Sequence, residues 1–292
     1  MLPASAGVPT SRASEPWRTY SELLFSGALE PALTQEWLAW SQTQQGSGVR
    51  GSRLKLGFIA GAGNDIENGD QFETFTAHGY GFGLLAADLV QPFLLAYFTL
   101  SAHAYSRGSW IAPESTAIDR EKTSLSFCAP AGTVAPLYHK WMLVFEEPRL
   151  RVLWLNKACP RSWLTEGQEI NYRAVPTRYG RISLKTVSAI DSARQVHLSL
   201  TDWAPVDKQG SPVLPGGLPE GGLRIRLRAP DRQHMAARLQ IKAVDLCGGV
   251  TLCVKWTGFD SADETLVFTK DDLMAQKGAL LGLLRNATVT FG

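Results

Sequence analysis

Residues 82–105 read FGLLAADLVQPFLLAYFTLSAHAY, and residues 106–115 continue with SRGSWIAPES. The first segment is apolar on almost every side, which is typical of a helix that is buried in a large protein or spans a membrane. Asp88 and Pro92 lie within it, and a central Asp disfavours insertion into a bilayer by about 2.5–3.5 kcal/mol. We therefore predict one buried helix over 82–105 that leads into a functional loop.

Helical periodicity also occurs on both sides of this segment. Apolar residues over 17–44 recur at spacings of three and four around Pro31, which predicts two short helices or one bent helix. A second stripe predicts a helix that starts near Pro130 or Thr133, ends at Pro148 and forms a hairpin with the central helix. This stripe consists of Ala131, Val134, Ala135, Tyr138, Trp141, Met142 and Phe145.

After Pro148 the period changes from that of helices to that of strands. Leu223, Ile225 and Leu227 alternate with arginines, which predicts one buried and one solvent-exposed face. Many short strands with turns between them are typical of an antiparallel sandwich. The predicted strands lie at 150–155, 169–175, 181–188, 196–200, 223–227, 239–246, 251–256, 265–269 and 287–291. The predicted fold class is α+β, with a flexible start at 1–16, α-helical hairpins over 17–148 and an antiparallel β-sandwich over 149–292.

The composition narrows the classes of function. A chain of 292 residues with a formal net charge of +2 lacks the basic excess of a nucleic-acid-binding protein, and we expect neither nucleic acid nor a membrane as a partner. The start, 1–16, has no apolar core and predicts no secretory signal. The four cysteines, Cys128, Cys159, Cys247 and Cys253, lack CxxC spacing and predict free, mostly buried thiols. The alternative is a disulfide between Cys247 and Cys253, which flank a Gly-Gly turn. We expect no metal and no cofactor, and the compartment stays open.

Three segments carry a resemblance to a known family: RGSWIAPES at 107–115, SFCAPAGTVAPLYHKWML at 126–143 and ACPRSWL at 158–164. Together with the strand-rich region that follows, they resemble the C-terminal part of six-hairpin (α/α)6 toroid glycoside hydrolases. This group includes the α-L-rhamnosidase-like enzymes. The resemblance covers about residues 75–245. It implies the last helical hairpins of a partial α/α toroid followed by a β-sandwich, and a carbohydrate as the ligand.

By position, the resemblance implies that Glu114 is the general base of an inverting hydrolase. Such enzymes need a carboxylate that takes a proton from the attacking water. Trp110 is a candidate stacking platform for a sugar ring, and candidate hydroxyl-binding residues are Tyr105, Arg107 and Ser109. The alternative interpretation is structural, with Trp110 as a core residue and Glu114 as a cap of a turn or helix.

The chain is too short for all six hairpins of a toroid, and the helices that supply the general acid in the family are missing. We therefore expect a glycoside hydrolase-like portion that is incomplete or inactive alone and associates with a missing toroid half or another protein partner. One alternative is a non-catalytic structural or interaction module. Another is a toroid-type polysaccharide lyase that uses Tyr105 or His103 for proton abstraction. His139, beside Trp141, is predicted to serve in packing.

Overall fold

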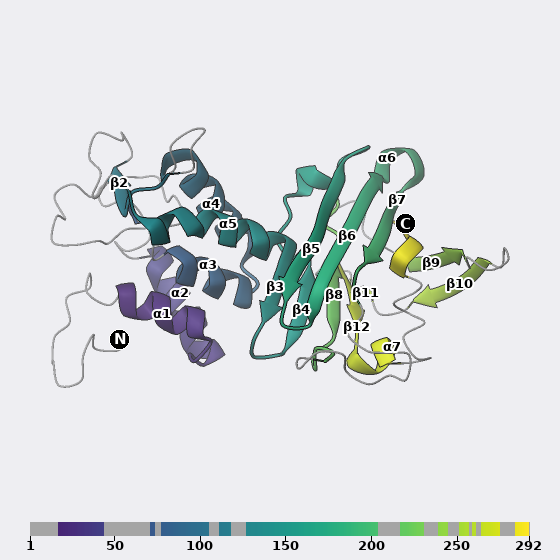
Figure 1. Cartoon of the computed structure of the whole chain (residues 1–292), viewed down its shortest axis with the longest axis horizontal. Helices are drawn as coiled ribbons and strands as arrows, with labels where there is room; N and C mark the ends of the chain where they lie inside the picture. Colours follow the sequence, from purple (N-terminus) through teal and green to yellow (C-terminus); the bar gives the residue numbers. More distant parts are fainter. Residues whose placement is uncertain are drawn as a thin grey trace. The chain divides into compact units, whose positions relative to one another are not determined.

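The chain divides into two compact units, Met1–Trp141 and Met142–Gly292. Helices dominate the first unit and strands dominate the second, so the fold class is α+β, as predicted (Figure 1). The predicted boundary, Pro148, follows a strand that belongs to the second unit. The computed structural model describes residues 17–43, 71–73, 77–104, 111–117, 127–203, 217–230, 239–244, 251–256, 259–260, 264–274 and 284–291.

The first unit is built from α-helices and one short hairpin. Pro31 begins the second helix, where its missing N–H leaves no helical bond unmade, so the prediction of two helices over 17–44 is confirmed. The hairpin pairs β1 (Gln71–Glu73) with β2 (Ser115–Ala117) in antiparallel fashion. The helices are α1 (Trp17–Ser26), α2 (Pro31–Thr43), α3 (Ala77–Ala86), α4 (Val90–Thr99), the π-helix η3 (Leu100–Ala104) and α5 (Ala129–Leu143).

The prediction of one continuous helix over 82–105 is wrong, because the chain breaks between α3 and α4. Asp88 lies in the break with a φ of 60°. Proline in a helix clashes with the carbonyl four residues earlier, and for Pro92 that residue is Asp88. Pro92 instead lies in the first turn of α4, where it is tolerated.

Among the described residues, none of the helices has both the length and the apolar character that a membrane span requires.

Tyr138 of α5 anchors the core of the first unit. Its ring is buried and stacks on Phe93 with a centroid distance of 4.8 Å, and its hydroxyl donates to the carbonyl of Ala77 at 2.6 Å. Gly81 is required beside it, because a Cβ there would collide with the Tyr138 ring. Apart from Phe145, the predicted stripe of α5 is buried as a helical face. Phe145 instead lies in a strand, since the helix ends at Leu143.

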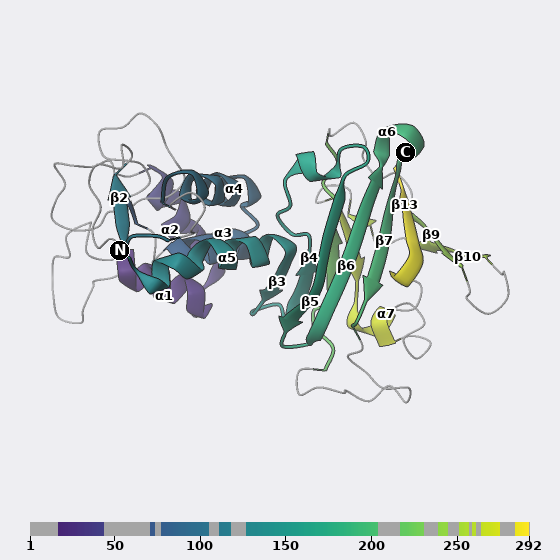
Figure 2. The same cartoon turned by 45° about the horizontal axis from the view of Figure 1, so that its top comes forward.

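The second unit contains a five-stranded sheet, a four-stranded sheet and a separate hairpin. The five-stranded order is β11-β12-β8-β4-β3, the four-stranded order is β13-β7-β6-β5, and β9 pairs with β10. Figure 2 shows β5, β6 and β7 side by side. The strands are β3 (Val144–Glu147), β4 (Val152–Leu155), β5 (Glu169–Thr177), β6 (Gly180–Ala189), β7 (Gln195–Thr201), β8 (Leu223–Arg226), β9 (Leu239–Val244), β10 (Thr251–Trp256), β11 (Phe259–Asp260), β12 (Thr265–Phe268) and β13 (Ala287–Thr290).

Each segment that was predicted as a strand contains one, and four short strands were not predicted: β1 and β2 in the first unit, and β3 and β11 in the second. All pairings between the described strands are antiparallel except β4 with β8, which are parallel. Antiparallel pairing was expected throughout, so this pair is a correction. The chain reaches β8 from β4 only after the whole β5–β7 meander, which is the long crossover that parallel neighbours need.

One hydrophobic cluster joins the two sheets. Alternate residues of β4 and β8, such as Leu153 and Ile225, pack in the same buried cluster as Leu184 of β6 and Leu198 of β7. The predicted alternation is therefore confirmed for the core-facing residues. It fails for the opposite face of the five-stranded sheet, where two arginines that were expected to be exposed are buried. Arg226 is 4% exposed, and Arg228, just after β8, is 6% exposed.

Candidate functional site

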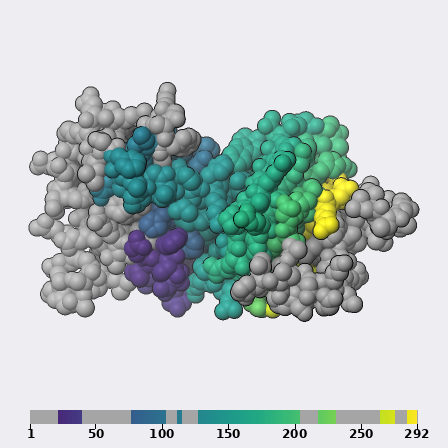
Figure 3. Space-filling view, viewed as in Figure 1, coloured from purple at the N-terminus to yellow at the C-terminus, as the bar shows by residue number. Residues whose placement is uncertain are grey.

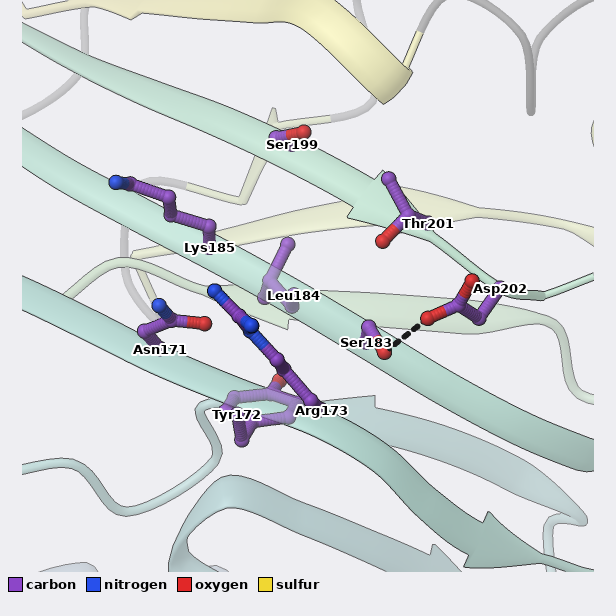
Figure 4. Close-up of a pocket in the computed structure, with 9 residues that line it drawn as sticks. All are labelled: Asn171, Tyr172, Arg173, Ser183, Leu184, Lys185, Ser199, Thr201 and Asp202. Carbon is purple, nitrogen blue, oxygen red and sulfur yellow. Dashed lines mark hydrogen bonds between the residues drawn. The ribbon is translucent and has the colours of Figure 1, made fainter.

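A polar groove lies on the face of β5, β6 and β7 that points away from the core, and its volume is about 350 Å³ (Figure 4). In the space-filling view of Figure 3, the teal-to-green surface that these strands form faces the viewer. Tyr172 and Leu184 line the groove only at its floor, since both belong to the core. The polar lining residues are Asn171, Arg173, Ser183, Lys185, Ser199, Thr201 and Asp202.

Strand register sets the spacing of these side chains. Asn171 pairs with Lys185, which pairs with Ser199 on the next strand, and Ser183 pairs with Thr201. Directly opposed residues of antiparallel strands have Cβ atoms about 4.5–5.5 Å apart. The two rows therefore present a closely spaced set of hydroxyl, amide and ammonium groups on a rigid sheet.

A β-bulge in β5 shapes one side of the groove. The register between β5 and β6 shifts between Tyr172 and Val175, and Ala174 in the bulge has a φ of 52°. The Ala174 N–H donates to Ser183 Oγ at 2.7 Å, and this hydroxyl donates to Asp202 Oδ2 at 2.6 Å. Bulges redirect side chains and are frequent beside functional sites. Here the bulge consists of Arg173 and Ala174, which together lie opposite Ser183.

Asp202 closes the other side of the groove with a strained backbone. It follows the end of β7 and has a φ of 61°, in the left-handed region that is uncommon for residues other than glycine. Such strain is found where the surrounding structure holds a residue for a functional purpose. The hydrogen bond from Ser183 fixes the Asp202 carboxylate and leaves it able to accept further bonds from a ligand.

The cations of the groove differ in their pairing. Lys185 Nζ lies 2.7 Å from Glu169 Oε2, and Asn171 Nδ2 donates to Glu169 Oε1 at 2.9 Å. The Lys185 hydrogen bond is the largest cause that lowers the pKa of Glu169. Arg173 makes no hydrogen bond or ion pair with any described residue. The groove thus combines hydrogen-bond donors, acceptors and one guanidinium that is open to a ligand.

The predicted site residues belong to the first unit. Glu114 is half-buried, directly before β2, whose first residue Ser115 pairs with Glu73 of β1. The other predicted residues lie outside the described part of the chain: Tyr105, Arg107, Ser109 and Trp110. The grouping of these four with Glu114 therefore remains a prediction. The same holds for His103, whose side chain also lies outside the described residues.

Tyr97 and His139 form a polar pair in the first unit that sequence reasoning missed. Tyr97 Oη lies 3.3 Å from His139 Nδ1. Partial burial raises the pKa of Tyr97 and lowers the pKa of His139, although the His139 side chain keeps an exposed side. The π-helix η3 begins just after α4, and π-helical turns are often found at functional sites. The hydrogen bond and the ring contact with Tyr97 agree with the packing role that was predicted for His139.

The described residues contain no group of three or more His, Cys, Asp or Glu side chains that could hold a metal ion. Cys128 and Cys159 are free, and Cys159 is buried. Burial raises the pKa of the Cys159 thiol, which keeps it protonated and unreactive. Cys247 and the side chain of Cys253 lie outside the described residues.

Comparison with protein-family models, with curated proteins and with solved structures finds no match for this chain. Any functional role must therefore rest on the geometry of its own residues.

Arg173, Lys185 and Asp202 were not among the residues predicted from the sequence. The signal was present, because polar residues alternate along β5, β6 and β7, but the same alternation occurs on any sheet with one face in water.

Proposed function

We propose that the chain is a carbohydrate-active protein and that the groove on β5, β6 and β7 binds a saccharide. The observation that carries the proposal is the lining of the groove, which combines hydroxyl, amide and carboxylate groups on a rigid sheet. Sugar hydroxyls donate and accept hydrogen bonds, so they need partners of both kinds. A volume of about 350 Å³ lies within the range of small-molecule sites.

The order of elements supports a relationship to the six-hairpin glycoside hydrolases. Helices α3 to α5 precede the strands, as the last hairpins of an (α/α)6 toroid precede its closing β-sandwich in that group. We interpret the first unit as a partial toroid and the two sheets that share one core as the sandwich. The missing hairpins would come from a partner or from a longer chain.

Glu114 is the proposed general base of this activity. Such a base takes a proton from water while a separate carboxylic acid protonates the leaving oxygen. Pro113 restricts the backbone before Glu114, and the β1–β2 pairing holds the residue after it. Tyr105, Arg107, Ser109 and Trp110 are the proposed sugar contacts near it.

Binding is tested first, with a glycan array and calorimetry on the full chain. Asp202→Asn should weaken binding of a glycan hit about tenfold, because removal of a charged hydrogen-bond acceptor loses about 1.5 kcal/mol. Asp271→Asn, an exposed residue of α7, is the matched control and should bind normally. A wild-type protein that binds no glycan, or an Asp202→Asn variant that binds like wild type, contradicts the proposal.

Hydrolysis is tested separately with a panel of glycosides. If Glu114 is the base, Glu114→Gln should lower kcat at least about 100-fold, the usual contribution of a general base. Glu36→Gln, on the exposed surface of α2, should leave kcat unchanged. Full activity in Glu114→Gln removes the catalytic role. Absence of hydrolysis in the wild type removes it too, without affecting the binding proposal.

A second candidate function is that of a non-catalytic interaction module. The observation in its favour is a set of large apolar side chains that are exposed on the first unit, which is the surface type that protein partners cover. These are Phe25, Leu95, Phe98, Ile111 and Phe127, and Phe127 is 64% exposed. Phe98→Ser should then weaken association in sedimentation experiments and leave glycan binding unchanged.

A third candidate is a toroid-type polysaccharide lyase. The Tyr97–His139 pair favours it, since a phenol bonded to a neutral imidazole can exchange a proton with a substrate. This pair would act in place of the predicted Tyr105 or His103. A lyase releases an unsaturated sugar that absorbs in the ultraviolet, and Tyr97→Phe should abolish that release.

A further inference from the structure

We infer that the ligand of the groove is an acidic saccharide whose carboxylate binds Arg173. The inference rests on the proposed saccharide-binding function of the same groove and specifies the class of sugar. Its basis is the position of Arg173 among the charged groups of the groove, together with the pairing of each of those groups.

The first observation is the direction of the Arg173 side chain. The guanidinium lies along the groove, toward Lys185 and away from Asp202 (Figure 4). Arg173 belongs to the β-bulge, since Arg173 and Ala174 together lie opposite Ser183, and the bonds from Ala174 N to Ser183 Oγ and from Ser183 Oγ to Asp202 hold the bulge in place. Arg173 is thus positioned by a built feature of the sheet.

The second observation is that its donors remain available. A guanidinium has five N–H donors in a planar fork, and Arg173 makes no hydrogen bond or ion pair with a described residue. Arg161 shows how this chain satisfies an arginine internally: it forms a bidentate pair with Glu264 at 2.8 and 2.7 Å. Arg173 has no hydrogen-bonded carboxylate in the described part of the chain. Its charge contributes to the lowered pKa of Glu169 without a hydrogen bond or ion pair between the two, so its fork stays available for a ligand.

The third observation is the separation of charge along the groove. Arg173 and Lys185 lie at one end, and Glu169 already holds Lys185. Asp202 lies at the other end with the hydroxyls of Ser183 and Thr201. A carboxylate matches the fork of an arginine with two parallel hydrogen bonds. A ligand with a carboxylate at one end and hydroxyls at the other fits this pattern, and a uronic acid residue in a glycan has that chemistry.

The experiment compares acidic glycans with their uncharged esters on the full chain. Oligogalacturonate, oligomannuronate and oligoglucuronate are each titrated beside their methyl esters by calorimetry. At least one acid should bind ten or more times tighter than its ester, and its affinity should fall as salt rises. Methyl esterification removes the charge and keeps the ring and the linkage, so the ratio reports the carboxylate contact.

Variants then locate the contact. Arg173→Gln should remove the preference for the acid and leave the affinity for the ester unchanged, and Arg173→Lys should keep part of the preference because it keeps the charge without the fork. Arg285→Gln, an exposed arginine of the same unit, is the matched control and should behave as wild type. Circular dichroism verifies that the variants fold.

The outcomes separate this inference from the function on which it rests. If acid and ester bind equally and Asp202→Asn weakens both, saccharide binding stands and the acidic preference is wrong. If the preference persists in Arg173→Gln, the assignment to Arg173 is wrong. If no acidic or neutral glycan binds, the proposed function fails as well.

Discussion

In the second unit, the four-stranded sheet exposes the charged side chains on the face away from the core, whereas the five-stranded sheet buries them. Arg173 and Lys185 of the first sheet are exposed. Arg226 of the second is 4% exposed, and Lys157, just after β4, is 2% exposed. β6 of the first sheet and β8 of the second both alternate apolar residues with charged or polar ones. Burial, rather than residue type, therefore decides whether a charge is open to solvent and ligands or is held within the protein.

The buried cations are held by an aromatic ring and by backbone carbonyls. Lys157 Nζ lies 3.7 Å from the centre of the Trp154 ring, and the guanidinium carbons of the buried Arg226 and the half-buried Arg224 lie at 4.8 and 4.9 Å. A desolvated cation–π contact stabilises by about 2 kcal/mol. Arg226 and Arg228 also donate to the carbonyls of Lys157 and Cys159. Burial, together with the nearby charge of Arg161, lowers the pKa of Arg228 to about 10.

Removal of the Trp154 ring should have the largest effect on the difference between the two sheets. Trp154→Ala should destabilise the second unit by about 3–5 kcal/mol, the usual loss for a buried large aromatic residue, because it also leaves three cations without their π-face. Arg173→Gln on the exposed sheet should change stability by less than about 0.5 kcal/mol. The measurement is urea unfolding, monitored by hydrogen exchange of the β4 and β8 amides. These amides report the stability of the second unit alone.

Trp154→Phe provides the control for that experiment. It keeps an aromatic face for the cations and should recover a large part of the lost stability. A Trp154→Ala variant as stable as Arg173→Gln would mean that the buried cations do not depend on the ring. The two faces would then not differ in what their charged residues contribute to stability.

Two ion pairs with the same N–O distance differ mainly in exposure, so they allow a closer comparison of buried and exposed charges, with a smaller expected effect on stability. Arg161 Nη2 lies 2.7 Å from Glu264 Oε2, and Lys185 Nζ lies 2.7 Å from Glu169 Oε2. The side chains of the first pair are 22% and 10% exposed, and those of the second are 48% and 38% exposed. Glu264→Gln should destabilise by about 3 kcal/mol, because it leaves a largely buried guanidinium without its anion.

Urea unfolding at two salt concentrations checks this prediction. The effect of Glu264→Gln should persist in 0.5 M salt, since the pair is shielded from solvent ions. Equal losses in Glu264→Gln and Glu169→Gln, or the same salt dependence for both, would show that exposure does not distinguish the pairs.

The strands were predictable because their signal is local. Alternation in the segment that forms β8 identified the core face through Leu223 and Ile225. The fate of Arg226 was not predictable, because its burial depends on Trp154, which lies far away in the sequence and reaches Arg226 only through the parallel β4–β8 pairing. The groove was not predictable for the same reason. It depends on strand register and on a bulge at Ala174, and no residue near Ala174 predicts that bulge from the sequence.

The helical part shows a different limit. Apolar content predicted burial correctly for residues such as Leu84 and Phe93. It does not show where one helix ends and the next begins. The break at Asp88 was visible in the sequence as Pro92, four residues later. The prediction gave more weight to the uninterrupted apolar run than to this proline, which disfavours a continuous helix but does not forbid one, since α5 continues through Pro136.

The smallest expected effect is the pH dependence of the exposed pair. The hydrogen bond from Lys185 lowers the pKa of Glu169 below its ordinary value of 4.5. A carboxyl whose pKa is lower in the folded than in the unfolded state stabilises the fold above the unfolded pKa. That contribution is lost as the pH falls through the folded value. Wild type should therefore lose slightly more stability than Glu169→Gln between pH 5 and pH 3, in melts at low salt, and the difference should vanish in 0.5 M salt. A difference that survives in salt would mean that this face is shielded from solvent like the opposite one, and Arg173 would then lack the open surroundings that a saccharide carboxylate needs.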